Sequence, residues 1–158
     1  MPGSGSVPAV DALVSFRNNP VLVSVRARVP WRVSALCLVL SRFHGRKARL
    51  DHLHLITWAL GTDGTRELLF VWLSGVRPMD GATARVDPAL PTTVALASGE
   101  GLVSINNAGK VELTGAGIGL AREIDAVTSL MHVEKAFLQR IMPLNETRLT
   151  RTLGALAQ

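Results

Sequence analysis

The chain has little of several residue types on which common protein functions depend. It has 158 residues, with no tyrosine, four phenylalanines, three tryptophans and a single cysteine. So few aromatic side chains argue against a protein that binds single-stranded nucleic acid, because such proteins stack bases on aromatic rings. The lone Cys37 excludes an internal disulfide, and it lies in an apolar run over residues 35–40. We therefore expect it to be a small buried hydrophobic residue.

Long hydrophobic runs are also missing. No apolar stretch approaches the roughly 20 residues that a membrane-spanning helix needs. The first ten residues, MPGSGSVPAV, lack the basic start and the apolar segment of a signal peptide. We therefore expect no membrane association and a cytoplasmic location, with which a single cysteine agrees.

Patterns that carry catalysis or metal binding are not found in the sequence. His52 and His54 are two residues apart on a predicted helix and point to different sides of it, so they are poor joint ligands for a metal. The carboxylates are dispersed and form no acid–base pair. Gly115, Gly117 and Gly119 lack the buried strand and the Lys-Ser/Thr step of a phosphate loop, which favours close helix packing instead. We expect a protein that is not an enzyme and that has no cofactor and no metal.

Charged residues make up only 18% of the chain, against 47% apolar residues. Such a composition favours an apolar face that is buried against a partner. A general bias toward Ala, Val, Leu and Arg is the alternative explanation, and the sequence leaves both open.

The positive charge is unevenly distributed, within a net charge of +5. Residues 12–50 contain eight basic side chains and no acidic one. Such a block attracts phosphates or an acidic protein surface, or it is a set of solvated arginines on several faces. The predicted basic contacts to nucleic acid or to a partner are Arg26, Arg28, Arg42, Arg46, Lys47, Arg49 and Lys110.

Residues 101–124 are the most informative segment for the fold. An apolar run at Val103 and Ile105 meets an Asn/Gly-rich turn, and a second short run follows at Val111 and Leu113. This pattern predicts a β-hairpin. Thr114 then predicts the N-cap of a helix, because its hydroxyl can accept a bond from a free backbone N–H. A hairpin placed between two helices is typical of the wing of a winged-helix domain.

The remaining periodicities predict an α+β fold that is mostly helical. An alternating pattern predicts a strand over residues 21–29 that extends the sheet of the wing, and Asp51 predicts the cap of the second helix. Helices are expected over 31–43, 51–60, 66–74, 91–98, 114–127 and 129–142, and after a cap at Asn145. The predicted organisation is a flexible segment over 1–18, a winged-helix-like domain over 19–127 and a C-terminal helical extension over 128–158.

The predicted helix before the hairpin, PTTVALAS, has no charged side chain and no amide. Winged-helix proteins that read DNA place Arg, Asn or Gln in this position to contact base edges. The segment therefore argues against sequence-specific reading of DNA, and favours a protein contact or an undiscriminating phosphate contact.

Residues 87–124 resemble the helix-and-wing portion of small winged-helix proteins, including the Leu113-Thr114-Gly117 step that leaves the wing. The order of a strand, a helix opened by Pro30 and Trp31, a helix start at residues 50–53 and the wing is similar to that of the middle components of bacterial ABC-type three-component systems. These include the Lamassu-like antiphage systems.

The resemblance implies an accessory subunit that joins an SMC-like ABC ATPase to an effector, often a nuclease. The alternative is a winged-helix transcription regulator that binds DNA as a homodimer. Within the first hypothesis we expect the C-terminal helices to bury an apolar stripe against another subunit, formed by Phe137, Leu138, Ile141, Leu149 and Leu153.

Overall fold

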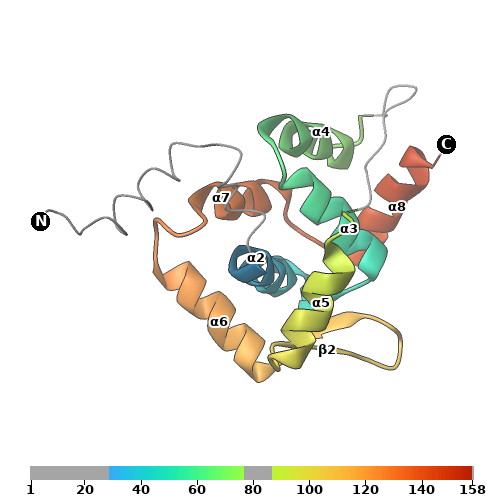
Figure 1. Cartoon of the computed structure of the whole chain (residues 1–158). Helices are drawn as coiled ribbons and strands as arrows, with labels where there is room; N and C mark the ends of the chain where they lie inside the picture. The colour runs from blue at the N-terminus through green and yellow to red at the C-terminus, as the bar shows by residue number, and fades with distance from the viewer. Residues whose placement is uncertain (1–28, 77–86, 158) are drawn as a thin grey trace, which may run out of the picture. The chain divides into compact units, whose positions relative to one another are not determined.

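A computed structural model describes residues 29–76 and 87–157 (Figure 1). The chain divides into two compact units, Met1–Arg32 and Val33–Gln158, and every described element except the first turn of α2 belongs to the second unit. The elements are α2 (Val29–Arg42), η2 (His44–Arg46), β1 (Lys47–Ala48), α3 (Leu50–Ala59), α4 (Asp63–Leu73), α5 (Leu90–Gly99), β2 (Val103–Ile105), β3 (Val111–Leu113), α6 (Gly115–Ala126), α7 (His132–Ile141) and α8 (Glu146–Leu156). The described part is mostly helical with a small antiparallel sheet, as expected for the α+β class.

Helix α2 is the central element of the core. Its residues Ala35 to Leu40 are all buried, because an uninterrupted apolar run can form a helix that is covered on every side. The helix begins at Val29 and includes Pro30 in its first turn, where a proline loses no internal hydrogen bond. The prediction that Val29 ends a strand is therefore wrong. The rest of that predicted strand, residues 21–28, lies outside the described residues.

The hairpin is confirmed, and β2 and β3 pair antiparallel with Val103 opposite Leu113. The Asn106 side chain accepts the backbone N–H groups of Ala108 and Lys110, at 2.9 and 3.0 Å, and thereby holds the turn closed. The third strand of the sheet is β1, which pairs with β3 in the order β1-β3-β2. It follows the turn of residues 44–47 after α2, which we call the basic turn because it carries Arg46 and Lys47. Part of the predicted basic surface is therefore built into the sheet of the hairpin.

Thr114 caps α6 as predicted, since its hydroxyl accepts the N–H of Gly117 at 3.2 Å and donates to the Gly101 carbonyl at 2.6 Å. Gly117 is where this helix meets the hairpin. A Cβ atom there would lie 2.1 Å from the carbonyl oxygen of Leu102 and 2.7 Å from Leu113 Cδ2. The interpretation of the glycines as packing residues is thus confirmed at Gly117, whereas Gly119 has nothing within 4 Å of such an atom.

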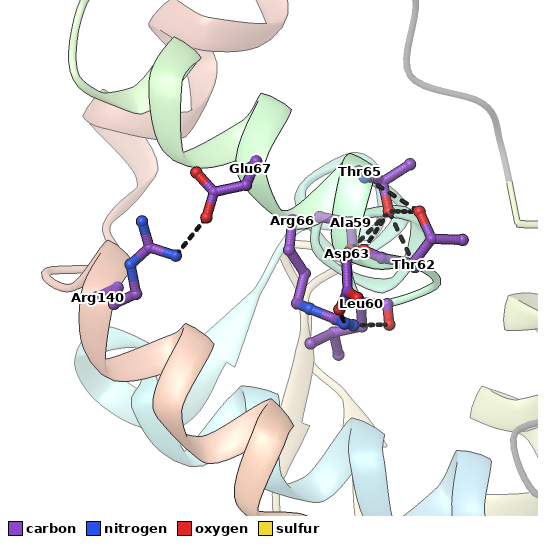
Figure 2. A network of polar contacts seen from close by, with 8 residues as sticks. All are labelled: Ala59, Leu60, Thr62, Asp63, Thr65, Arg66, Glu67 and Arg140. Atoms are coloured by element: carbon purple, nitrogen blue, oxygen red, sulfur yellow. Dashed lines mark hydrogen bonds and ion pairs between the residues drawn. The ribbon is translucent and has the colours of Figure 1, made fainter.

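Most predicted helix starts differ from those in the structure by one to three residues, and those of α3 and α4 have a local explanation. Helix α3 begins at Leu50 with Arg49 at the N-cap, so the prediction that Asp51 is the cap is wrong; its carboxylate accepts the neighbouring His52 N–H at 2.8 Å. Helix α4 begins at Asp63, earlier than predicted. Thr62 and Thr65 exchange hydrogen bonds there in a capping box, which supplies partners for free N–H groups of the first turn (Figure 2).

The C-terminal helices belong to the same packed unit as the rest. Helix α7 packs against α4, and α8 packs against both α3 and α4. Asn145 caps α8 as predicted, accepting the N–H of Arg148 at 2.9 Å. The Arg148 guanidinium in turn donates to the carbonyl oxygens of Leu73, Ile141 and Pro143, so one side chain links the ends of α4 and α7 to α8.

Candidate nucleic-acid or partner interface

The basic turn after α2 is held on two sides. Phe43 before the turn is buried and forms a bridge with Leu144, and the His44 N–H donates to the Leu144 carbonyl at 3.3 Å. After the turn, Ala48 is buried opposite Val111 of β3. The turn is therefore fixed both to the segment between α7 and α8 and to the hairpin sheet.

Backbone geometry in this turn exposes two cations. Gly45 has a φ of 75° and Arg46 a φ of 54°, so both lie in the left-handed region, which is uncommon for a residue such as arginine. Arg46 and Lys47 are exposed, and no ion pair joins either of them to another residue within 29–76 or 87–157. They are the predicted contact residues that the structure leaves most available.

Other predicted cations are paired with carboxylates. Arg42 forms a two-pronged pair with Asp125 of α6, at 2.9 and 2.7 Å, and its guanidinium lowers the pKa of that carboxyl. The Arg42 side chain is only 18% exposed, so it joins α2 to α6 and offers little to a partner. Arg26 and Arg28 lie outside the described residues.

Arg49 and Lys110 are partly available. Arg49 lies 2.7 Å from the Asp51 carboxylate, and Lys110 on the hairpin lies 3.4 Å from the Glu146 carboxylate at the start of α8. Both carboxylates are about half exposed to solvent. Solvent-exposed pairs of this kind are weak, so another anion can replace the carboxylate.

A shallow cleft brings these groups together. Its volume is about 140 Å³, and it is lined by Phe43, His44, Lys47, Ala48, Arg49, His52, Lys110, Asn145 and Glu146. A pocket for a drug-sized molecule has roughly 300–1,000 Å³. The cleft is thus suited to one small group presented by a larger partner.

His52 is the buried titratable group of this cleft. It is 1% exposed, and its Nε2 atom lies 3.2 Å from the hydroxyl of Thr150 on α8. Burial lowers the pKa of the imidazole from its ordinary 6.5, so the neutral form is favoured in the folded protein. This histidine ties α3 to α8 beneath the basic residues.

The predicted apolar interface on the C-terminal helices is wrong for most of its residues. Phe137, Leu138, Ile141 and Leu149 are each at most 3% exposed, because they pack inside the chain itself. Leu153 is intermediate in exposure. The helical periodicity correctly identified a buried stripe, but the side chains that cover it come from the same polypeptide.

Exposed apolar side chains lie elsewhere, and those of α5 and β2 are the most relevant to the predicted function. Helix α5 packs against β2 (Figure 1). Leu96 of α5 is 41% exposed and Ile105 of β2 is 60% exposed, and Thr92 and Ala95 are exposed as well. We call these four residues the α5–hairpin surface. None of them carries a charge, as the sequence predicted for this helix.

Two carboxylates, Glu146 and Glu112, lie close to the basic residues of the cleft, and the sequence alone did not indicate this. Glu146 reaches Lys110 across 36 positions in the chain, and Glu112 lies opposite Lys47 in the sheet register. The Glu112 carboxylate accepts a long bond from the Asn106 amide at 3.5 Å. The only indication in the sequence that the hairpin belongs to this site was the basic residue Lys110 in its turn.

Residues 29–76 and 87–157 contain no group of three or more His, Cys, Asp or Glu side chains placed to hold a metal ion. Within the same ranges, no helix has the length and hydrophobicity that crossing a membrane requires. The Cys37 thiol is fully buried, and burial raises its pKa to about 11. A thiol in that state is a poor nucleophile.

Comparison of the chain with protein-family models, curated proteins and solved structures gave no match.

Proposed function

We propose that this protein is a non-enzymatic accessory subunit of a bacterial antiphage defence complex, in which it joins an SMC-like ABC ATPase to a nuclease-type effector. The observation that carries the proposal is the uncharged α5–hairpin surface. A winged-helix protein that reads DNA has polar side chains at this helix to contact base edges. Here the exposed side chains of the helix carry neither a charge nor an amide, which suits a protein partner better; they are Pro91, Thr92, Ala95, Leu96 and Ser98.

The order of the elements supports a winged-helix-like domain. A helix (α2) leads into a short strand (β1), three helices follow, and the last of them (α5) runs directly into the β2–β3 hairpin. Domains of this kind serve as joints between subunits as well as DNA-binding modules. In this role the ATP chemistry belongs to the large subunit and bond cleavage to the effector.

The exposed cations support a second contact within the same complex, to the phosphate backbone of DNA. Arg46 and Lys47 are available for it without any reading of sequence. The same two cations are also consistent with the alternative function, which is a winged-helix transcription regulator. That alternative requires a homodimer and a preferred operator sequence.

The test is co-expression of this chain, carrying an affinity tag, with the products of the genes on either side of it. We expect an SMC-like ATPase and an effector to co-purify with the tagged chain. Leu96→Asp should reduce their recovery at least about ten-fold, because a buried charge without a partner costs several kcal/mol at an interface.

Leu68→Asp is the matched control, since Leu68 on α4 is similarly exposed at 45%. It should leave recovery unchanged. Purification of the wild-type chain alone would contradict the proposal, and so would equal effects of the two substitutions. A homodimer that binds one duplex sequence in preference to others would favour the regulator.

A further inference from the structure

The cleft beneath the basic turn collects cations from two separate parts of the chain. Lys47 and Arg49 come from β1 and the residue that follows it, and Lys110 comes from the hairpin. Because Ala48 between them points into the core, Lys47 and Arg49 extend to the opposite side of this edge strand. Arg46 precedes them on the same fixed turn.

Two features make this cluster more than a scatter of surface charge. The backbone that bears Arg46 and Lys47 is held by the buried residues Phe43 and Ala48, so little motion is lost when a ligand binds. In addition, Arg46 keeps a left-handed conformation that glycine or asparagine adopts at lower cost. A charged side chain at a backbone position that disfavours it is a reason to look for a function.

The acidic residue Glu146 lies beside one of these cations, Lys110. The Glu146 carboxylate lies 3.4 Å from the Lys110 ammonium at the edge of the cleft. An exposed ion pair contributes at most about five-fold to an equilibrium constant, so a phosphate can displace this carboxylate from the lysine. Glu146 therefore competes with an incoming anion without blocking it.

We propose that Arg46, Lys47, Arg49 and Lys110 form a binding site for the phosphate backbone of duplex DNA, and that Glu146 weakens this binding by occupying Lys110. The proposal rests on the part of the proposed function that gives this chain a contact to DNA. The cleft is small, about 140 Å³, so it receives a phosphate group while the rest of the polymer stays outside.

The aromatic residues favour a duplex over a single strand. Among the described residues that line the cleft, Phe43 is the only phenylalanine, tyrosine or tryptophan, and it is 5% exposed. Base stacking on a buried ring is impossible, whereas phosphates of a duplex need only cations at the surface. Contacts to phosphates alone carry no sequence information, so unrelated duplexes should bind equally.

The experiment measures binding of the isolated full-length chain to a fluorescein-labelled 20-base-pair duplex by anisotropy, between 50 and 200 mM salt. Two duplexes of unrelated sequence are used. Arg46→Asn, Lys47→Gln and Lys110→Gln should each weaken binding several-fold and reduce the slope of log K against log salt by about 1. Glu146→Gln should tighten binding about two- to five-fold, because it releases Lys110.

Arg122→Gln is the matched control for the loss of one positive charge. Arg122 is exposed on α6, is not one of the residues that line the cleft, and has no ion pair among the described residues. It should change affinity less than two-fold. Thermal unfolding of each variant checks the fold, and Arg46→Asn should be no less stable than wild type, since asparagine tolerates the left-handed conformation.

Equal weakening by Arg122→Gln and Lys47→Gln would overturn the proposal, because net charge alone would then explain binding. Unchanged affinity in Glu146→Gln would refute the competing role of that residue. Displacement of the duplex by polyglutamate at an equal concentration of charges would show that the site takes acidic protein surfaces. Because these measurements use the isolated chain, a failure here leaves the co-purification with an ATPase and an effector standing as a separate result.

Discussion

Replacement of Gly117 by alanine tests the packing of the hairpin against α6, because packing and helix propensity predict opposite effects of this substitution on stability. In an exposed helix interior, Gly→Ala stabilises by about 1 kcal/mol. At Gly117 the new methyl group would lie 2.1 Å from the Leu102 carbonyl oxygen and 2.7 Å from Leu113 Cδ2. The hairpin or the helix must therefore move by about 1 Å to restore normal contact distances.

The cost of that movement can be worked from the local contacts. The Leu102 carbonyl accepts the N–H of Thr114 at 3.0 Å, and Thr114 is also the cap of α6. Overpacking costs about 1–3 kcal/mol, and a weakened hydrogen bond adds roughly 1 kcal/mol. After the propensity gain is subtracted, Gly117→Ala should destabilise the fold by about 1–3 kcal/mol, or lower the Tm by roughly 2–12 °C.

Gly119→Ala is the matched control on the same helix, since nothing lies within 4 Å of its Cβ position. It should raise the Tm by about 2–4 °C through the propensity gain. Thermal and urea unfolding, followed by circular dichroism, measure both variants. If Gly117→Ala were as stable as Gly119→Ala, the close approach of α6 to the hairpin would be refuted.

Two further predictions concern the C-terminal helices. Arg148→Met removes the donors to the carbonyls of Leu73 and Ile141 while it keeps an apolar stem. It should lower the free energy of unfolding by about 2 kcal/mol, measured as a lower urea midpoint at an unchanged m-value. An unchanged midpoint would show that these hydrogen bonds contribute nothing to stability. His52 has a pKa below 6.5 in the folded protein, so on acidification the unfolded chain binds the proton before the folded chain does. The free energy of unfolding should therefore be constant with respect to this group above pH 6.5 and should decline as the pH falls below that value. His52→Gln should remove this part of the pH dependence, and a wild-type urea midpoint that is constant from pH 7 to pH 5 would contradict the argument.

Local signals predicted the elements whose ends depend on local chemistry. The hairpin, the caps at Thr114 and Asn145 and the helix before the hairpin all follow from residues within a few positions of one another. The start of α4 was missed because the Thr62–Thr65 capping box has threonine where the usual signature has glutamate or glutamine. Figure 2 shows the result, in which the turn also binds Arg66 through the Leu60 carbonyl.

Contacts between distant segments could not be predicted from the same patterns. The strand that completes the sheet is Lys47–Ala48, only two residues long and without alternation to reveal it. Periodicity marked Phe137, Leu138 and Ile141 as buried but could not say which polypeptide covers them. For the same reason the sequence showed a block of positive charge without the carboxylate of Glu146 that is paired with Lys110.

The difference between Arg46 and Arg42 has the same origin. Both are basic residues of one segment and look equivalent in the sequence. The fold places Arg42 beside Asp125 of α6, whereas Arg46 lies on an exposed turn. A basic block therefore defines a region of positive potential, and only the tertiary structure separates the cations that hold the fold together from those that can meet a ligand.

The proposed role of the chain as a joining subunit is tested most directly by the molar mass and composition of the assembly that it forms with the products of the neighbouring genes. Light scattering coupled to gel filtration, followed by mass spectrometry, should find the tagged chain in a stable assembly with an SMC-like ATPase and an effector. The Leu96→Asp variant should elute without them. Elution of the wild-type chain by itself at 16.9 kDa, beside fully expressed neighbours, would contradict the account.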